Sequence, residues 1–215
     1  MQKTRILLIR HGESEANRES RFAGHSDFPL SEKGLKQAHC TAEYISKNYR
    51  VDAVYASDLK RAFDTAKATA ERLSLQVTPD PAFREIFAGA WEGMPFEEIR
   101  RDYPEDYTVW MTDIGRAGCT DGEKVSALQE RVLSAILRLC EQNPGKTLVI
   151  GTHATPIRAT ECALRGLPLS EMHSVAWVSN ASVTELCYEN GRLTLVSSGE
   201  SRHLSHLHTS LPSNV

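Results

Sequence analysis

The sequence predicts an α/β layered fold with a mostly parallel central sheet flanked by helices. Short apolar segments typical of buried parallel strands alternate with longer segments of helical periodicity. Polar residues follow several of the apolar segments directly, where the strands of such sheets open into loops. With 215 residues, 40% of them hydrophobic, the chain is long enough for one domain with a sizeable core over residues 1–215.

The N-terminal part of the chain follows a strand-helix-strand order. A strand is expected at 6–9, and Ser31 is a candidate N-cap for the helix after it. The apolar residues of that helix recur at spacings of three and four: Leu35, Ala38, Ala42 and Ile45. The next strand is expected at 53–56, followed by a helix that Ser57-Asp58 caps, and a further strand at 75–78.

A long irregular stretch separates this part from the next helix. Residues 81–122 lack periodicity and are rich in glycine and proline, so we expect an excursion that contains short helices. An amphipathic helix is expected at 125–139, ending at Asn143-Pro144-Gly145. A fully buried strand at 147–150 follows it.

The C-terminal part adds one more helix and a hairpin. Thr155-Pro156 are expected to begin the helix as cap and first-turn proline. Residues 182–196 predict a β-hairpin around Asn190-Gly191. Residues 200–215 are polar, and we expect them to fray.

Composition and charge exclude several classes of protein. The formal net charge is −3, which gives the whole molecule no electrostatic reason to bind nucleic acid or an anionic membrane. The apolar run before Arg10 is too short for a signal peptide or a membrane span. The five cysteines form no Cys-x-x-Cys pair, so we expect small core residues of a protein of the reducing cytoplasm. Nothing in the sequence indicates an oligomeric state.

Basic and histidine side chains follow the ends of three predicted strands. Arg10-His11-Gly12 comes directly after the first strand, and His153 after the strand at 147–150. Arg61 lies in the first turn of the helix after the strand at 53–56, where free backbone N–H groups already favour an anion. Because ligands of open α/β sheets bind beyond the carboxyl ends of the strands, we expect these side chains to converge on one anion.

This set of side chains suits phosphoryl transfer. A transferred phosphoryl group needs donors around its oxygens, a nucleophile in line with the bond that breaks, and an acid for the leaving oxygen. Arg10, Arg61 and His153 are candidate donors, and a neutral His11 is a candidate nucleophile beside Gly12, which allows phosphate close to the backbone. The acid is then a carboxyl group or another histidine.

The residues around His11 belong to a longer ordered pattern. The first motif is Leu8-Ile9-Arg10-His11-Gly12-Glu13-Ser14, followed by Asn17. Further motifs follow as islands: Arg21-Phe22-Ala23-Gly24, Asp27, Leu30-Ser31-Glu32-Lys33-Gly34, Ser57-Asp58-Leu59-Lys60-Arg61-Ala62, Arg84-Glu85, Trp91-Glu92-Gly93 and Thr152-His153. In this order they resemble the histidine phosphatase superfamily, which includes cofactor-dependent phosphoglycerate mutases, over about residues 4 to 200.

The resemblance implies a phosphoglycerate mutase-like fold and a phosphatase that uses neither metal nor cofactor on a small phosphorylated metabolite. It implies that His11 is phosphorylated and that Glu85 is the proton donor. The residues implied to hold the phosphate are Arg10, Asn17, Arg61 and His153, and those implied to contact the substrate are Ala23, Gly24 and Ala154.

Two residues depart from the family pattern. Ala154 follows the second histidine where many relatives have glycine, which keeps the backbone N–H but restricts the backbone angle. Lys124 follows Gly122-Glu123 where relatives often have serine, which removes a helix cap.

The substrate loops, at 20–28 and about 86–122, distinguish hydrolysis from mutase activity. The family's mutases follow the acid with arginine, histidine and tyrosine and carry an arginine pair after a later tryptophan. This chain has Ile86-Phe87-Ala88 and Trp110-Met111-Thr112 instead. Because a mutase must retain a doubly phosphorylated intermediate, we expect net hydrolysis, with a cofactor-dependent phosphoglycerate mutase as the alternative. The residues that could compensate are Arg100, Arg101 and Arg116.

Other functions fit the sequence less well. A non-catalytic module that binds phosphorylated ligands predicts loss of the nucleophile, the second histidine or the acid, and all three are present. A dinucleotide-dependent oxidoreductase predicts a Gly-x-Gly-x-x-Gly motif after a strand, and none occurs. The tail histidines His203, His206 and His208 lack the neighbouring ligands of a zinc site, and Trp91 and Trp110 are interpreted as packing residues.

Overall fold

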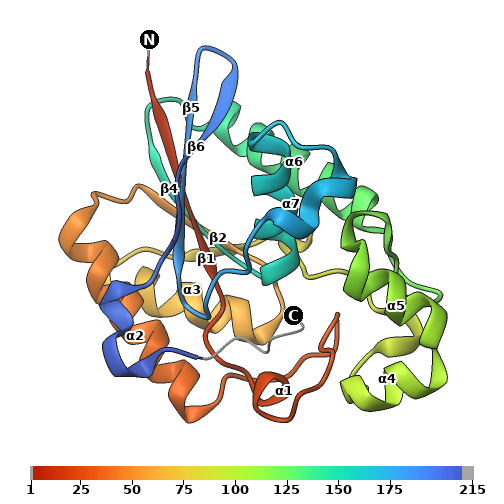
Figure 1. The fold of residues 1–215 in the computed structure, drawn as a ribbon. Coiled ribbons are helices and arrows are strands. Elements are labelled where there is room, and N and C mark those ends of the chain that lie inside the picture. Colours follow the sequence, from red (N-terminus) through yellow and green to blue (C-terminus); the bar gives the residue numbers. More distant parts are fainter. Residues whose placement is uncertain (1, 210–215) are drawn as a thin grey trace.

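The computed structural model describes residues 2–209 and contains a six-stranded sheet with helices on both faces (Figure 1). The sheet order is β3-β2-β4-β1-β5-β6. The strands are β1 (Thr4–Arg10), β2 (Ala53–Ala56), β3 (Val77–Pro79), β4 (Thr147–Thr152), β5 (Val183–Glu189) and β6 (Arg192–Glu200). The first four strands are parallel to one another and the last two pair antiparallel, so the predicted mostly parallel α/β sheet is confirmed.

Alternating side chains of the central strands pack into two separate cores, one on each face of the sheet. Ile6 and Leu8 of β1 pack on the face covered by α6 and α7, whereas Leu7 and Ile9 pack on the face covered by α2 and α3 (Figure 1). The α-helices are α1 (Glu15–Arg18), α2 (Glu32–Asn48), α3 (Lys60–Arg72), α4 (Phe96–Asp102), α5 (Pro104–Thr112), α6 (Val125–Gln142) and α7 (Ala154–Leu164). This two-faced burial explains why the central strands are almost entirely apolar.

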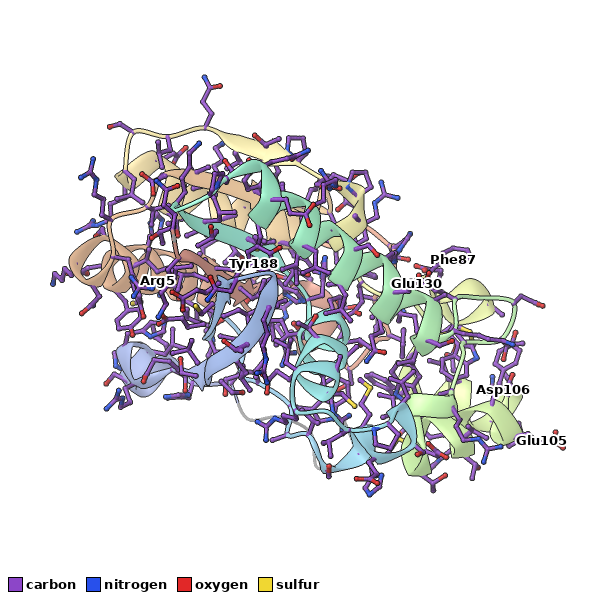
Figure 2. The ribbon with its side chains drawn as sticks, turned by 90° about the horizontal axis from the view of Figure 1, so that it is seen from above. Arg5, Phe87, Glu105, Asp106, Glu130 and Tyr188 are labelled. Atoms are coloured by element: carbon purple, nitrogen blue, oxygen red, sulfur yellow. The ribbon has the colours of Figure 1, made fainter. Side chains whose placement is uncertain are left out.

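Residues 81–122 form the expected excursion with short helices, beside one end of α6 (Figure 1). It contains α4, α5 and the 3₁₀ helices Pro81–Phe83, Gly89–Trp91 and Ile114–Arg116. Trp91 is fully buried at its centre, with ring centroids 5.5 Å from Phe22 and 6.0 Å from Trp110, as its interpretation as a packing residue requires. Glu105 lies at the outer end of the excursion (Figure 2).

Two helices begin at other residues than the sequence predicts. Helix α3 begins at Lys60 with Leu59 as N-cap, because the Ser57 hydroxyl instead accepts the Leu59 N–H within the turn. Helix α7 begins at Ala154, because β4 continues to Thr152 and only His153 separates the two elements. The predicted caps Ser57-Asp58 and Thr155 are therefore wrong, whereas the expected lack of a side-chain cap at Lys124 is confirmed.

Smaller differences concern the bounds of one strand, one residue of a helix, one short helix and one cysteine. Strand β3 lies at 77–79 rather than 75–78, and Leu35 is 48% exposed although the rest of its predicted stripe is buried. Helix α1 was not predicted; Ser14 begins it through a capping box with Asn17. Four of the cysteines are buried, and Cys40 is half-buried.

The segment before residue 210 is packed, so the expected fraying is wrong for residues 200–209. Strand β6 continues to Glu200, and a 3₁₀ helix at Arg202–Leu207 follows with Leu204 buried. The His203 ring stacks on Tyr44 of α2 at 4.7 Å. Residues 210–215 lie outside the described residues. Within residues 2–209, no three potential metal ligands cluster, and no helix combines the length and apolar character that crossing a bilayer requires.

Candidate active site

The ends of β1 and β4 bring two histidines together. These strands are parallel neighbours with Arg10 opposite Thr152, so the residues that follow them, His11 and His153, leave the sheet side by side. Their ring centroids are 5.1 Å apart, and both side chains are buried. Because β1 and β4 are neighbours in the sheet, the histidines that follow them converge, as the sequence predicts.

His11 is held as a neutral imidazole with one nitrogen available. Its Nδ1 donates to its neighbour's carbonyl, the Gly12 oxygen, at 2.7 Å, which leaves the lone pair on Nε2. Burial holds the pKa of His11 well below its ordinary value, and the charges of Arg61 and Arg10 lower it further. A buried, neutral imidazole with an unprotonated Nε2 is the form in which histidine acts as a nucleophile.

Ser57 fixes the tautomer of His153. The Ser57 hydroxyl accepts the Leu59 N–H, so its own hydrogen is available for His153 Nε2, which lies 2.9 Å away. With the Ser57 hydrogen assigned to Nε2, the ring proton is assigned to His153 Nδ1, which is buried without a protein partner. Burial keeps the pKa of His153 well below its ordinary value. This N–H is therefore a buried donor without a protein partner.

Two buried guanidinium groups present further unsatisfied donors. Arg10 donates Nη1 to the Val178 carbonyl, and Arg61 donates to the carbonyls of Ser26 and Gly24. In both arginines Nε is buried without a partner. Burial lowers the pKa of each to about 10, so both stay charged at neutral pH. Two fixed cations with unpaired donors beside a neutral histidine make a site for an anion.

Asn17 and Gly12 complete this side of the site in different ways. Asn17 Oδ1 accepts from Ser14 and from Asn180 Nδ2, which leaves the Asn17 Nδ2 group as a donor. A Cβ at residue 12 would lie 2.5 Å from the Gly34 carbonyl oxygen. Glycine is therefore needed here for the close approach of α2, and not only for access of phosphate to the backbone.

Glu85 approaches from the excursion. It follows the 3₁₀ helix Pro81–Phe83, and its Oε1 accepts its neighbour's backbone N–H, that of Ile86, at 2.8 Å. Arg131 of α6 donates to the carbonyls of Ala82, Arg84 and Glu85, at 2.8 to 2.9 Å. The segment that carries Glu85 is thus held by a side chain from another element rather than by a helix or strand of its own.

A single cavity of about 530 Å³, counted to its open mouth, contains most of these groups. Of the predicted site residues, those that line it are Arg10, His11, Asn17, Ala23, Gly24, Arg61, Glu85 and Ala154, with His153 behind His11. Gly24 has φ +50, and a Cβ there would meet Glu92 Oε1 at 2.3 Å. Ala154 has the ordinary backbone of a first helical residue, so its departure from glycine causes no strain.

Sequence reasoning missed several residues around this cavity. Ser57 was interpreted as a helix cap, and Asn180 lies before the hairpin without any motif. The further lining residues are Arg21, Phe22, Phe96, Trp110, Thr155 and Trp177. Arg21, Phe22 and Ser57 lie within the family motifs, which were the available indication. The others reach the cavity only through tertiary packing.

Comparison with known proteins gives one consistent picture. Residues 6–201 match the model of the histidine phosphatase superfamily (branch 1). The chain is 33% identical to phosphoserine phosphatase 1 of Hydrogenobacter thermophilus, covering 95% of this chain and 96% of that protein. It is 33% identical to glucosyl-3-phosphoglycerate phosphatase of Mycobacterium tuberculosis, covering 86% of each. The solved structure of Bacillus stearothermophilus YhfR superposes with a TM-score of 0.90 at 28% identity, covering 94% of this chain and 100% of that one.

Proposed function

The chain belongs to the histidine phosphatase superfamily and is a phosphatase, and from this premise we propose that it works without a metal through a phosphohistidine on His11. The observation that carries the proposal is the set of buried donors without protein partners around a neutral His11. These are Arg10 Nε, Arg61 Nε and His153 Nδ1. A phosphoryl group satisfies all of them at once, because it offers several charged acceptor oxygens.

The first step transfers the phosphoryl group to the protein. His11 Nε2 attacks phosphorus, the bond to the substrate oxygen breaks, and Glu85 gives its proton to that oxygen. Arg10 and Arg61 stabilise the charge on the transferred group, with the Asn17 amide as a further donor. Water then attacks phosphorus, the bond between phosphorus and His11 Nε2 breaks, Glu85 takes a proton from the water, and inorganic phosphate leaves.

The arginines supply the positive charge that Mg²⁺ supplies in many phosphoryl-transfer sites. We therefore propose that turnover survives chelation. We also propose a reducing cytoplasm as the compartment, supported by five cysteines without a disulfide.

We propose a small phosphate monoester as substrate and hydrolysis as the outcome. Named relatives act on phosphoserine and on glucosyl-3-phosphoglycerate. The arginines that could have compensated for the missing mutase cations are directed elsewhere: Arg101 pairs with Asp102, Arg116 with Asp113, and neither they nor Arg100 line the cavity. Without such cations, a second phosphate has little to retain it, so water reaches the phosphohistidine.

The test is phosphate release from a panel of phosphate monoesters, with and without EDTA, alongside 3-phosphoglycerate primed with 2,3-bisphosphoglycerate. We expect metal-independent release from the panel. Rapid formation of 2-phosphoglycerate with negligible phosphate release would instead identify a mutase. Tight binding of every panel compound without turnover would identify a binding module.

A further inference from the structure

The cavity combines the proposed phosphate-binding groups with a largely aromatic lining. Away from Arg10, Arg61 and Glu85, its lining is dominated by four aromatic side chains, Phe22, Phe96, Trp110 and Trp177. Three of them form a connected group, since the Phe22 ring lies 5.1 Å from Trp110 and 5.8 Å from Phe96. Phe22 and Trp110 are almost completely buried, so the group is rigid.

The lining offers little to a second anionic group on the substrate. Apart from the two proposed phosphate-binding arginines, Arg21 is the one lysine or arginine lining the cavity within residues 2–209. Its Nε pairs with Glu19 at 2.8 Å, and its Nη1 donates to the Gly93 carbonyl. Arg21 is therefore already engaged by Glu19 and by a backbone carbonyl, so it offers little to a substrate carboxylate.

Trp177 is held in place by a buried cation behind the cavity. The Arg158 guanidinium carbon lies 4.3 Å from the centre of the Trp177 ring. Arg158 also donates to the carbonyls of Val175 and His173, which fixes the irregular segment that carries the tryptophan. Because Arg158 does not line the cavity, its charge orients Trp177 rather than binding the substrate.

We propose that the preferred substrate is the phosphate monoester of an uncharged, apolar alcohol, whose carbon skeleton lies against these four aromatic side chains, and not a phosphorylated hydroxy acid or amino acid. The proposal rests on the proposed function, and it assigns Trp177 as a specificity-determining residue. Burial of a ring-sized apolar group favours such a substrate about tenfold to a hundredfold over a short analogue.

The kinetic test compares 2-phenylethyl phosphate with ethyl phosphate, because both release a simple primary alcohol. Phosphoserine and 3-phosphoglycerate are included as carboxylate-bearing esters. We expect kcat/KM for the phenylethyl ester to exceed that for each of the others by at least about tenfold. Equal values for the two alkyl esters, or a higher value for either carboxylate-bearing ester, would overturn the proposal.

A binding test separates this inference from the proposed function. Phosphonates cannot be hydrolysed, so the affinities of 2-phenylethylphosphonate, ethylphosphonate and the phosphonate analogue of phosphoserine are measured by calorimetry. We expect the phenylethyl compound to bind about tenfold more tightly than the others. If no ester is hydrolysed, the proposed function fails while the order of affinities still decides the specificity.

Substitutions of Trp177 test whether this side chain is responsible for the preference for the phenylethyl ester. Trp177→Ala should lower kcat/KM for 2-phenylethyl phosphate about tenfold and for ethyl phosphate less than about twofold, with Trp177→Phe restoring most of the difference. Leu35→Ala, an exposed apolar residue of α2 outside the cavity, is the control and should change neither value. An equal loss for both esters in Trp177→Ala would contradict the assignment.

Discussion

The two sides of the candidate site are held in different ways. His11, Arg10 and His153 leave buried parallel strands, and their positions follow from the register of β1 and β4. Glu85 lies on irregular backbone and depends on side chains from elsewhere, chiefly Arg131. The strand-end side is thus part of the core, whereas the excursion side is a loop held by a few polar contacts.

Glu92, a second carboxylate of the excursion, also holds irregular backbone through its side chain. Glu92 accepts the backbone N–H groups of His25, Ser26 and Ala88, and so joins the loop at 20–28 to the excursion. Side chains that bond backbone groups of distant segments replace the ladders of regular structure here. We therefore expect the proposed phosphoryl transfer to be insensitive to changes in the loops, and the proposed proton donation and recognition of the leaving group to be sensitive to them.

Removal of the nucleophile should have the largest effect. His11→Ala deletes the group that forms the covalent bond, and we expect a loss of at least about 10⁴-fold in kcat, because no neighbouring side chain replaces it. The variant should also lose acid-labile, base-stable labelling by a phosphorylated substrate. His39→Ala, an exposed histidine on α2, is the matched control. Retained turnover, or labelling at a serine, would rule out His11 as the nucleophile.

Removal of the proposed proton donor, Glu85, should slow alkyl and aryl phosphates to different extents. Glu85→Gln keeps the shape but lacks the proton, so alkyl phosphates should slow about 10²-fold to 10³-fold. Aryl phosphates with activated leaving groups need little protonation and should slow less than about tenfold. Glu97→Gln, an exposed residue of α4, serves as the control. Equal slowing of both classes would show that Glu85 binds rather than donates a proton.

The buried histidines should make stability depend on pH. Their folded-state pKa values lie well below the value near 6.5 of the unfolded chain, so the unfolded chain binds more protons as pH falls below about 6.5. The stabilisation is complete above that pH and decreases below it. Between pH 7.5 and 5.5, each such histidine should cost about 1.4 kcal/mol of the free energy of unfolding.

Urea unfolding at several pH values measures this dependence. His11→Gln should remove one histidine's share of the slope, whereas His39→Gln should leave it unchanged. An unchanged slope in His11→Gln would mean that His11 is not held neutral in the folded state. His203, whose pKa is also lowered by burial, contributes to the slope in all these proteins.

The fold and the strand-end side could be predicted because short-range patterns encode them. Apolar runs mark the strands, and the residues after β1 and β4 needed only the topology to converge. Glu85 could be assigned only through the family motif, since nothing local distinguishes it from a solvated carboxylate. The position of Trp177 depends on Arg158, 19 residues earlier in the chain, and the contact of Ser57 with His153 joins residues 96 positions apart. Sequence periodicity reports neither contact.

The smallest expected effect concerns the contact that holds the acid. Arg131 forms a two-point ion pair with Glu123 while donating to three carbonyls of the segment that carries Glu85. Arg131→Lys keeps the charge, but one ammonium group cannot reach all of these acceptors. We expect the carboxyl to lose its fixed position, so that kcat for alkyl phosphates falls about fivefold while KM and the rate for activated aryl phosphates change less than about twofold.

Arg138→Lys, two turns along the same helix face and paired with Asp80, repeats the substitution away from the acid and should leave both substrate classes unaffected. A selective loss in Arg131→Lys would place Arg131 in the same functional unit as Glu85, because it reproduces the leaving-group dependence of Glu85→Gln at a smaller scale. A loss equal for both substrate classes, or a shift in KM alone, would show that Arg131 stabilises the excursion in general. The contrast between the two sides of the site would then concern stability rather than proton transfer.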